Sequence, residues 1–165
     1  GLHHNAYRCR ASEETRRFYE DFLGLPLVHT LKIEQTMTGR KTGGTGVLHT
    51  FFQLDDGSSL AFFEAPDMPF EFKEQHDFDL HIALEVEPDT LDRMMAKGRA
   101  EGREVRGVSD HRFIRSIYFR DPNGYVIELA AKVPGHESAM DPTKSRAREM
   151  LDQWQSTKPA AARVA

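Results

Sequence analysis

The hydrophobic and polar residues of this chain follow one pattern that occurs twice. Each copy opens with a strand-like run, first at His4–Arg10 and again at His81–Glu87. A stretch with helical spacing follows each opening run, and a turn precedes each closing strand, at Asp55-Asp56-Gly57 and at Asp121-Pro122-Asn123-Gly124. The pattern predicts two modules, each with the element order βαβββ.

In the first copy, the spacing of Phe18, Phe22 and Leu23 indicates a helix. Ser12 is expected as its N-cap, and Gly24 as the left-handed residue that ends it. The remaining elements of this copy are three strands and a flexible loop between the first two, expected at Leu25–Glu34, Val47–Leu54 and Ser58–Ala65, with the loop over residues 36–46.

The second copy repeats this order. Its helix is expected over Asp89–Glu101, and its three later strands over Glu104–Ser109, Ile114–Arg120 and Tyr125–Lys132. The domain boundaries follow from these elements: a first module at 2–65, a linker at 66–79, a second module at 80–132, an extension at 133–157 and a disordered tail at 158–165.

The extension should contain one helix. Asp141 followed by Pro142 is a favourable helix start, because Asp caps the free N–H groups and Pro fits the first helical position. The apolar residues Met150, Leu151 and Trp154 are expected to anchor this helix.

Composition narrows the function classes. The chain has 165 residues, 39% of them hydrophobic and 29% charged, which is typical of a soluble globular protein. It has no apolar run long enough to span a bilayer and no signal-peptide pattern, so we expect no membrane association. A formal charge of −4 argues against a nucleic-acid surface. The single cysteine, Cys9, fits a reducing cytoplasm and is expected to be buried.

Strand alternation places two candidate metal ligands on one side. The apolar residues that alternate along the opening strand of the second copy should face the core, which leaves His81 on the other face. The same argument places Glu128 on the non-core face of the closing strand. Laying the first copy on the second puts His4 in register with His81, and Glu64 in register with Glu128. The doubled pattern predicts a metal site with pseudo-twofold symmetry.

Two segments resemble a known superfamily. Arg16–Leu25 (RRFYEDFLGL) looks like the first helix of the vicinal oxygen chelate superfamily, and Ile117–Glu128 (IYFRDPNGYVIE) looks like its closing hairpin. The superfamily includes glyoxalase I, type I extradiol dioxygenases, fosfomycin-resistance enzymes and bleomycin-binding proteins. The resemblance covers about residues 2–132. It implies an α+β fold in which two βαβββ modules form a curved mixed sheet around a cavity that holds a divalent metal, with the C-terminal helix as an addition.

A narrower resemblance concerns the extradiol ring-cleavage signature. The residues that carry it are His111, Ile117-Tyr118, Asp121-Pro122, Gly124 and Glu128, while Ser109 departs from the signature. The resemblance implies that His111 is an acid/base group, that Tyr118 contacts a substrate hydroxyl and that Glu128 is a metal ligand. Strand alternation also turns Tyr118 toward the cavity. His49 is a further candidate for a catalytic histidine in the cavity.

Two chemistries remain open at this stage. Two histidines and one carboxylate are the ligand set of non-haem Fe(II) oxygenases, which leaves positions for substrate and O₂. If Glu64 is also a ligand, His4, Glu64, His81 and Glu128 form the four-ligand set of glyoxalase I, which suits Ni²⁺ or Zn²⁺ as a Lewis acid. Mn²⁺ is a further possible metal.

We favour Fe(II) and an extradiol-type dioxygenase that acts on a catechol-like aromatic. The glyoxalase-type lyase or isomerase is the alternative, and a non-catalytic binding protein is the third. Part of a phenylalanine-rich set should line an apolar pocket while most of it forms core, namely Phe51, Phe52, Phe62, Phe63, Phe70, Phe72 and Phe78. A small aromatic substrate and a homodimer are the expected partners. The other histidines, His3, His29, His76 and His136, are interpreted as structural or surface residues.

Overall fold

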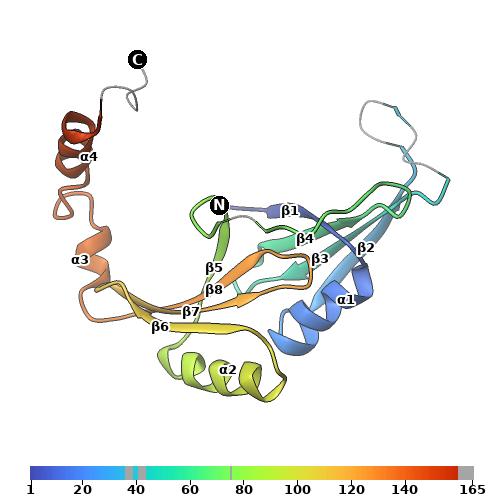
Figure 1. The fold of residues 1–165 in the computed structure, drawn as a ribbon, viewed down its shortest axis with the longest axis horizontal. Helices are drawn as coiled ribbons and strands as arrows, with labels where there is room; N and C mark the ends of the chain where they lie inside the picture. The colour runs from blue at the N-terminus through green and yellow to red at the C-terminus, as the bar shows by residue number, and fades with distance from the viewer. Residues whose placement is uncertain (36–38, 41–43, 75, 160–165) are drawn as a thin grey trace. The chain divides into compact units, whose positions relative to one another are not determined.

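The computed structural model describes residues 1–35, 39–40, 44–74 and 76–159, so parts of the predicted loop at 36–46 and tail at 158–165 lie outside the described residues. The elements of the first module are β1 (His4–Cys9), α1 (Ser12–Arg16), the π-helical η1 (Arg17–Phe22), β2 (Leu27–Ile33), β3 (Val47–Gln53) and β4 (Ser59–Glu64). Those that follow are β5 (His81–Glu85), α2 (Pro88–Ala100), β6 (Val105–Asp110), β7 (Ile114–Arg120), β8 (Val126–Lys132), α3 (His136–Met140) and α4 (Ala147–Thr157) (Figure 1).

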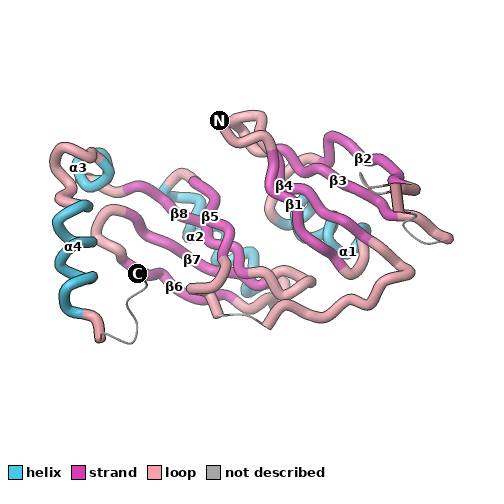
Figure 2. Tube along the Cα trace, turned by 90° about the horizontal axis from the view of Figure 1, so that it is seen from above, coloured by secondary structure: helices cyan, strands magenta, loops and turns pink. Residues whose placement is uncertain are grey.

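The strands form two four-stranded sheets, as predicted. The order is β1-β4-β3-β2 in the first and β5-β8-β7-β6 in the second (Figure 2). In the first sheet β1 runs parallel to β4, and β3 runs antiparallel to both β2 and β4. The fold is therefore α+β with two βαβββ modules. Among the described residues, no helix has the length and apolar character needed to cross a membrane.

The chain divides into two compact units. One contains Gly1–Ile82 and Tyr118–Glu128, and the other contains Ala83–Ile117 and Leu129–Ala165. The first unit therefore joins the first module to the hairpin turn of the second.

The C-terminal helix differs from its prediction. It begins at Ala147 and not at Asp141, because the Asp141 carboxylate instead accepts hydrogen bonds from the Thr143 N–H and hydroxyl in a separate turn. The anchoring prediction was wrong as well. The side chains of Met150, Leu151 and Trp154 are 52–66% exposed. No described residue covers this face of α4.

The aromatic side chains of η1 form the core of the first unit. Tyr19 is fully buried, with its ring centroid 4.6 Å from Phe62 and 5.6 Å from Phe52 of the sheet. Phe22 lies 5.1 Å from Phe119 of β7 in an edge-to-face arrangement. Edge-to-face aromatic pairs stabilise a core beyond the area that they bury. The helix thus packs against strands from both modules.

A buried carboxylate fixes the turn between β7 and β8. Asp121 is 2% exposed and accepts four hydrogen bonds. One oxygen accepts the backbone N–H groups of Asn123 and Tyr125, and the other accepts the Tyr19 hydroxyl at 2.9 Å and the Asn123 amide. Burial raises the pKa of the Asp121 carboxyl, and the four donors oppose this rise because they stabilise its charged form.

Asn123 extends this contact to the first module. Its side-chain oxygen accepts the Arg10 N–H at 2.8 Å, and its amide donates to the Thr15 hydroxyl at 3.2 Å. The Tyr125 hydroxyl donates to the Arg8 carbonyl. The Asp-Pro-Asn-Gly turn and the Tyr125 that follows it are therefore bonded to β1 and the residue just after it, to α1 and to η1.

Gly124 lets the linker lie against this turn. Its φ is +99°, and a Cβ there would lie 2.5 Å from the backbone N and O of Lys73. Other residues are excluded by both the conformation and the contact. The Lys73 N–H donates to the Asn123 carbonyl at 2.8 Å, so the linker is bonded to the turn at this point.

We expect Asp121→Asn to destabilise the protein by about 2 kcal/mol, because an amide cannot accept all four of these hydrogen bonds and buried donors lose their partner. Tyr19→Phe should cost about 1 kcal/mol. Urea unfolding of both single variants and of the double variant measures the coupling free energy between Tyr19 and Asp121. If the two losses are additive, the Tyr19–Asp121 hydrogen bond contributes nothing to stability.

Candidate metal centre

Two predicted ligands lie together in the first unit. The Nε2 atom of His81 is 3.2 Å from an Oε2 atom of Glu128, and the histidine side chain is 42% exposed while that of Glu128 is 6% exposed. Strand alternation predicted that these residues share a face, and this contact confirms it. The pair offers a nitrogen and a carboxylate oxygen from neighbouring strands at an accessible position.

The His81 ring is held in one orientation by contacts on both of its nitrogens. Its Nδ1 lies 2.8 Å from the Asp77 carbonyl oxygen, which only accepts, so Nδ1 carries the proton. The other ring nitrogen, Nε2, faces the Glu128 Oε2 atom. A main-chain carbonyl on the far nitrogen is the usual arrangement that orients a metal-binding histidine.

Tyr118 adds a hydroxyl to the pair. It lies in β7, opposite Glu128 in the hairpin, and donates to the Glu128 Oε1 atom at 3.3 Å. The two carboxylate oxygens of Glu128 thus have different neighbours, His81 on one side and Tyr118 on the other. This agrees with the predicted orientation of Tyr118 toward the cavity.

His4 and His49 lie together on one face of the first sheet. Their ring centroids are 6.0 Å apart, and both rings also contact Phe51. The His4 Nδ1 atom shares a hydrogen bond of 2.7 Å with Nδ1 of His3. The register of the strands defines this surface, called the histidine face below: His4, Ala6 and Arg8 of β1, Ser59, Ala61 and Phe63 of β4, Val47, His49, Phe51 and Gln53 of β3, and His29 and Leu31 of β2.

His49 is buried and has a defined tautomer. Its ring stacks on Phe63 at 3.8 Å, and its Nδ1 donates to the Phe62 carbonyl at 3.0 Å. Nε2 therefore keeps its lone pair. Burial lowers the pKa of His49, which favours the neutral ring that can accept a proton.

Arg8 gives the histidine face a positive charge. It is cross-strand from Phe63, and its guanidinium donates to the Met68 sulfur at 3.8 Å. Its Nε atom is buried and has no hydrogen-bond partner among the described residues. The neutral Met68 sulfur is a weak acceptor, so the guanidinium keeps donors available for an anion.

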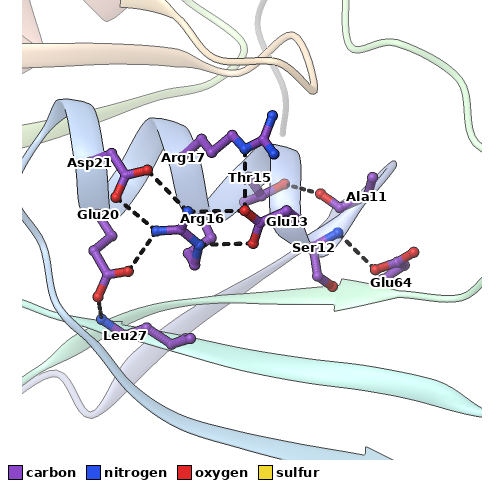
Figure 3. A network of polar contacts seen from close by, with 10 residues as sticks. All are labelled: Ala11, Ser12, Glu13, Thr15, Arg16, Arg17, Glu20, Asp21, Leu27 and Glu64. Carbon is purple, nitrogen blue, oxygen red and sulfur yellow. Dashed lines mark hydrogen bonds and ion pairs between the residues drawn. The ribbon is translucent and has the colours of Figure 1, made fainter.

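Glu64 lies on the opposite face. It is the cross-strand neighbour of Cys9 and Leu48, whose side chains point toward the helix. Its carboxylate accepts the Ser12 N–H at 2.7 Å, at the start of α1 (Figure 3). In place of the predicted Ser12 side chain, Glu64 thus bonds one of the free N–H groups of this helix.

The two hairpin turns show which residue corresponds to Glu128. The Leu54 N–H bonds to the Ser58 carbonyl in the first module, and the Asp121 N–H bonds to the Tyr125 carbonyl in the second. The third residue after Ser58 is Ala61, and the third residue after Tyr125 is Glu128. Glu64 is therefore out of register with Glu128, contrary to the sequence overlay. Aligning Gly57 with Gly124 would have revealed this.

The structure does not bring the predicted ligands into one cluster. Within residues 1–35, 39–40, 44–74 and 76–159, no group of three or more His, Cys, Asp or Glu side chains is arranged to hold a metal ion. His81 and Glu128 form one part, and His4 lies with His3 and His49 in another. His111 occupies the turn between β6 and β7, where its N–H donates to the Ile114 carbonyl and its side chain is exposed.

Comparison with known proteins agrees with the fold. The family described as the Glyoxalase/Bleomycin resistance protein/Dioxygenase superfamily matches residues 1–129. The chain belongs to this superfamily. The structural relatives of the chain are vicinal oxygen chelate proteins, and the resemblance in its sequence is confirmed. A search of curated proteins found no match.

Several solved structures share the superfamily fold. A glyoxylase/bleomycin resistance protein/dioxygenase domain from Frankia sp. EAN1pec has a TM-score of 0.63 and 18% identity, covering 83% of this chain and 95% of its own. The fosfomycin resistance protein FosX from Listeria monocytogenes, complexed with Mn(II) and sulfate, has a TM-score of 0.61 and 20% identity, covering 83% and 96%. A glyoxalase/dioxygenase from Nostoc punctiforme has a TM-score of 0.59 and 23% identity, covering 81% and 91%. Similarity at this level shows the fold alone.

Substitution of Glu64 and of Glu128 tests which of the two carboxylates binds metal. We expect Glu128→Gln to lower the affinity for Zn²⁺ at least about tenfold, whereas Glu64→Gln should leave it unchanged, because Glu64 faces the helix. Competition with a chromophoric chelator measures both affinities. A sharp loss of affinity in Glu64→Gln would instead support a four-ligand site.

Proposed function

We propose that the chain is a metal-dependent enzyme of the extradiol type, which cleaves a catechol-like ring with Fe(II) and O₂. His4, His81 and Glu128 would hold the metal. The observation that carries this proposal is the contact of His81 and Tyr118 with the two oxygens of Glu128. It brings two of the three proposed ligands and the tyrosine of the ring-cleavage signature together at one carboxylate.

The placement of Glu64 supports three ligands in preference to four. Ala61 has no donor atom at the position that corresponds to Glu128, and the Glu64 carboxylate is bonded to the Ser12 N–H. A set of two histidines and one carboxylate leaves coordination positions for a bidentate substrate and for O₂. The glyoxalase-type alternative, with Ni²⁺ or Zn²⁺, would require Glu64 to turn to the other face.

The residues of the chain divide the remaining roles. A bound Fe(II) would supply Lewis-acid binding of two vicinal oxygens and activation of O₂. Tyr118 would donate a hydrogen bond to a substrate hydroxyl, and the Nε2 atom of His49 would accept a proton from the substrate. His111 remains a predicted acid/base group. Phe51 and Phe63 offer aromatic surface to the ring, and the Arg8 charge suits a substrate that is an anion.

The separation of His4 from the other two ligands favours a homodimer. Among the described residues, His81 and Glu128 have no third metal-binding side chain arranged with them. A second copy of the chain would supply His4 and complete the site. An interface of this kind is two-fold symmetric, so each dimer would have two such sites.

The function is tested by loading the protein with Fe(II) and adding a panel of catechols, first without O₂ and then with it. We expect the visible spectrum to change when a catechol binds and a yellow ring-cleavage product to form once O₂ is admitted. Tyr118→Phe should lower kcat about 10²-fold. A loaded protein that binds no catechol would exclude ring cleavage, and a protein that takes up no metal would revive the non-catalytic alternative.

The composite site is tested by subunit complementation. His4→Ala and His81→Ala should each lose metal binding when purified alone. When the two variants are refolded together, we expect roughly a quarter of the wild-type metal content to return, because half of the dimers are mixed and each has one intact site of two. Elemental analysis measures it, and a metal content that stays at zero would place all ligands within one chain.

A further inference from the structure

Arg8 is a partly buried cation whose neighbours give it no acidic partner. One guanidinium N–H donates to the Met68 sulfur, and the buried Nε atom has no hydrogen-bond partner among the described residues. Arg10 and Arg16, by contrast, are each paired with glutamates of the first module. Within the part of the chain that the structure describes, no carboxylate forms an ion pair with Arg8. Burying a charge without an ionic partner is unfavourable, so this position favours an anion.

The surface around Arg8 does not repel an anion. None of the residues that make up the histidine face is Asp or Glu, although the whole chain has 26 acidic residues against 22 Lys and Arg. Glu64, which ends β4, has its carboxylate on the opposite face, bonded to the Ser12 N–H. An anion that reaches the histidine face therefore meets one formal positive charge and no negative charge from the residues of that face.

The strip of the face between His4 and Arg8 offers room for an aromatic ring. Ala6 lies between them on β1, is exposed, and is cross-strand from Ala61. Phe51 is cross-strand from Ala61 on the next strand, and its ring centroid is 5.3 Å from that of His4. Four residues along a strand span about 13 Å. The two ends of this strip are thus a candidate metal ligand and a guanidinium, separated by small side chains and bordered by an aromatic one.

We propose that Arg8 selects a substrate that carries a carboxylate on a short arm attached to its catechol-like ring. The ring would lie over Ala6 beside Phe51, with its vicinal oxygens toward His4 and its carboxylate bonded to the guanidinium in place of the Met68 sulfur. A carboxylate suits this donor, because its two oxygens accept parallel N–H bonds from one guanidinium. This inference rests on the proposed function for the position of the ring, whereas the preference for an anion concerns the metal-free protein as well.

The experiment compares dihydrocaffeate, a catechol with a propionate arm, with its uncharged methyl ester. NMR titration of the full chain measures the Kd of each ligand, once without metal and once with Fe(II) under argon. We expect the wild type to bind the acid at least about tenfold more tightly than the ester in both forms, because only the acid offers a charged acceptor to Arg8. The Arg8 Nε–H signal should shift when the acid is added and stay in place with the ester.

Two substitutions locate the source of this preference. Arg8→Gln should bring the ratio of the two Kd values to about one by weakening the acid alone, while Arg8→Lys should keep part of the ratio. Arg10→Gln is the matched control, because it removes the same charge two residues along, where the guanidinium is bonded to Glu14. It should keep the wild-type ratio. Circular dichroism confirms that each variant is folded.

Several results would overturn the proposal. A wild type that binds neither ligand, or binds both equally, has no such subsite. A ratio that persists in folded Arg8→Gln, or that falls equally in Arg10→Gln, would assign the preference to other charges. If Arg8→Gln does not fold, an Nε–H signal of Arg8 that the acid leaves unmoved in the wild type would refute the contact. A wild type that prefers the acid but cleaves no ring would refute the proposed function and leave the selectivity of Arg8 in place.

Discussion

The bonds that Asp121 accepts are the constraint on which the candidate site depends. Glu128 and Tyr118 occupy opposite strands of the hairpin whose turn contains Asp121. Because that carboxylate is bonded to Tyr19, and Asn123 to the backbone of Arg10 just after β1, the hairpin has a fixed position relative to the first module within its unit. Burial alone would make such a carboxyl unfavourable in its charged form. The aspartate is tolerated because each of its oxygens has two donors, and those donors come from parts of the chain about a hundred residues apart.

Much of this architecture could be predicted from the sequence. The alternation of Ile82 and Leu84 placed His81 on the outer face, and both apolar residues are buried as expected. The turn residues of both hairpins marked their positions correctly. Local patterns of this kind depend only on the geometry of a strand, so a single sequence reveals them.

Other features depend on contacts that no local pattern records. Glu64 and Glu128 each follow an apolar run in the last strand of their module, and this similarity concealed a difference of three residues in register. Asp141 has the chemistry of a helix cap, but its carboxylate stabilises a turn just ahead of α4. No sequence pattern marks the hydrogen bond that the Phe78 N–H donates to the His76 Nδ1 atom, since this bond depends on the conformation of the turn that contains both residues. The exposure of Phe72 and Phe78, at 45% and 92%, likewise places these two members of the phenylalanine-rich set outside the core.

The linker between the modules, residues 66–79, limits how one module could be replaced by another. Lys73 is bonded to the Asn123 carbonyl across Gly124, and a few residues later Asp77 meets the imidazole of His81. The segment that connects the two modules is thus also bonded to the hairpin and to a candidate ligand. Its length and path are therefore constrained from both ends. A chimaera that replaced one module with that of a homologue would therefore have to carry this connecting segment with it.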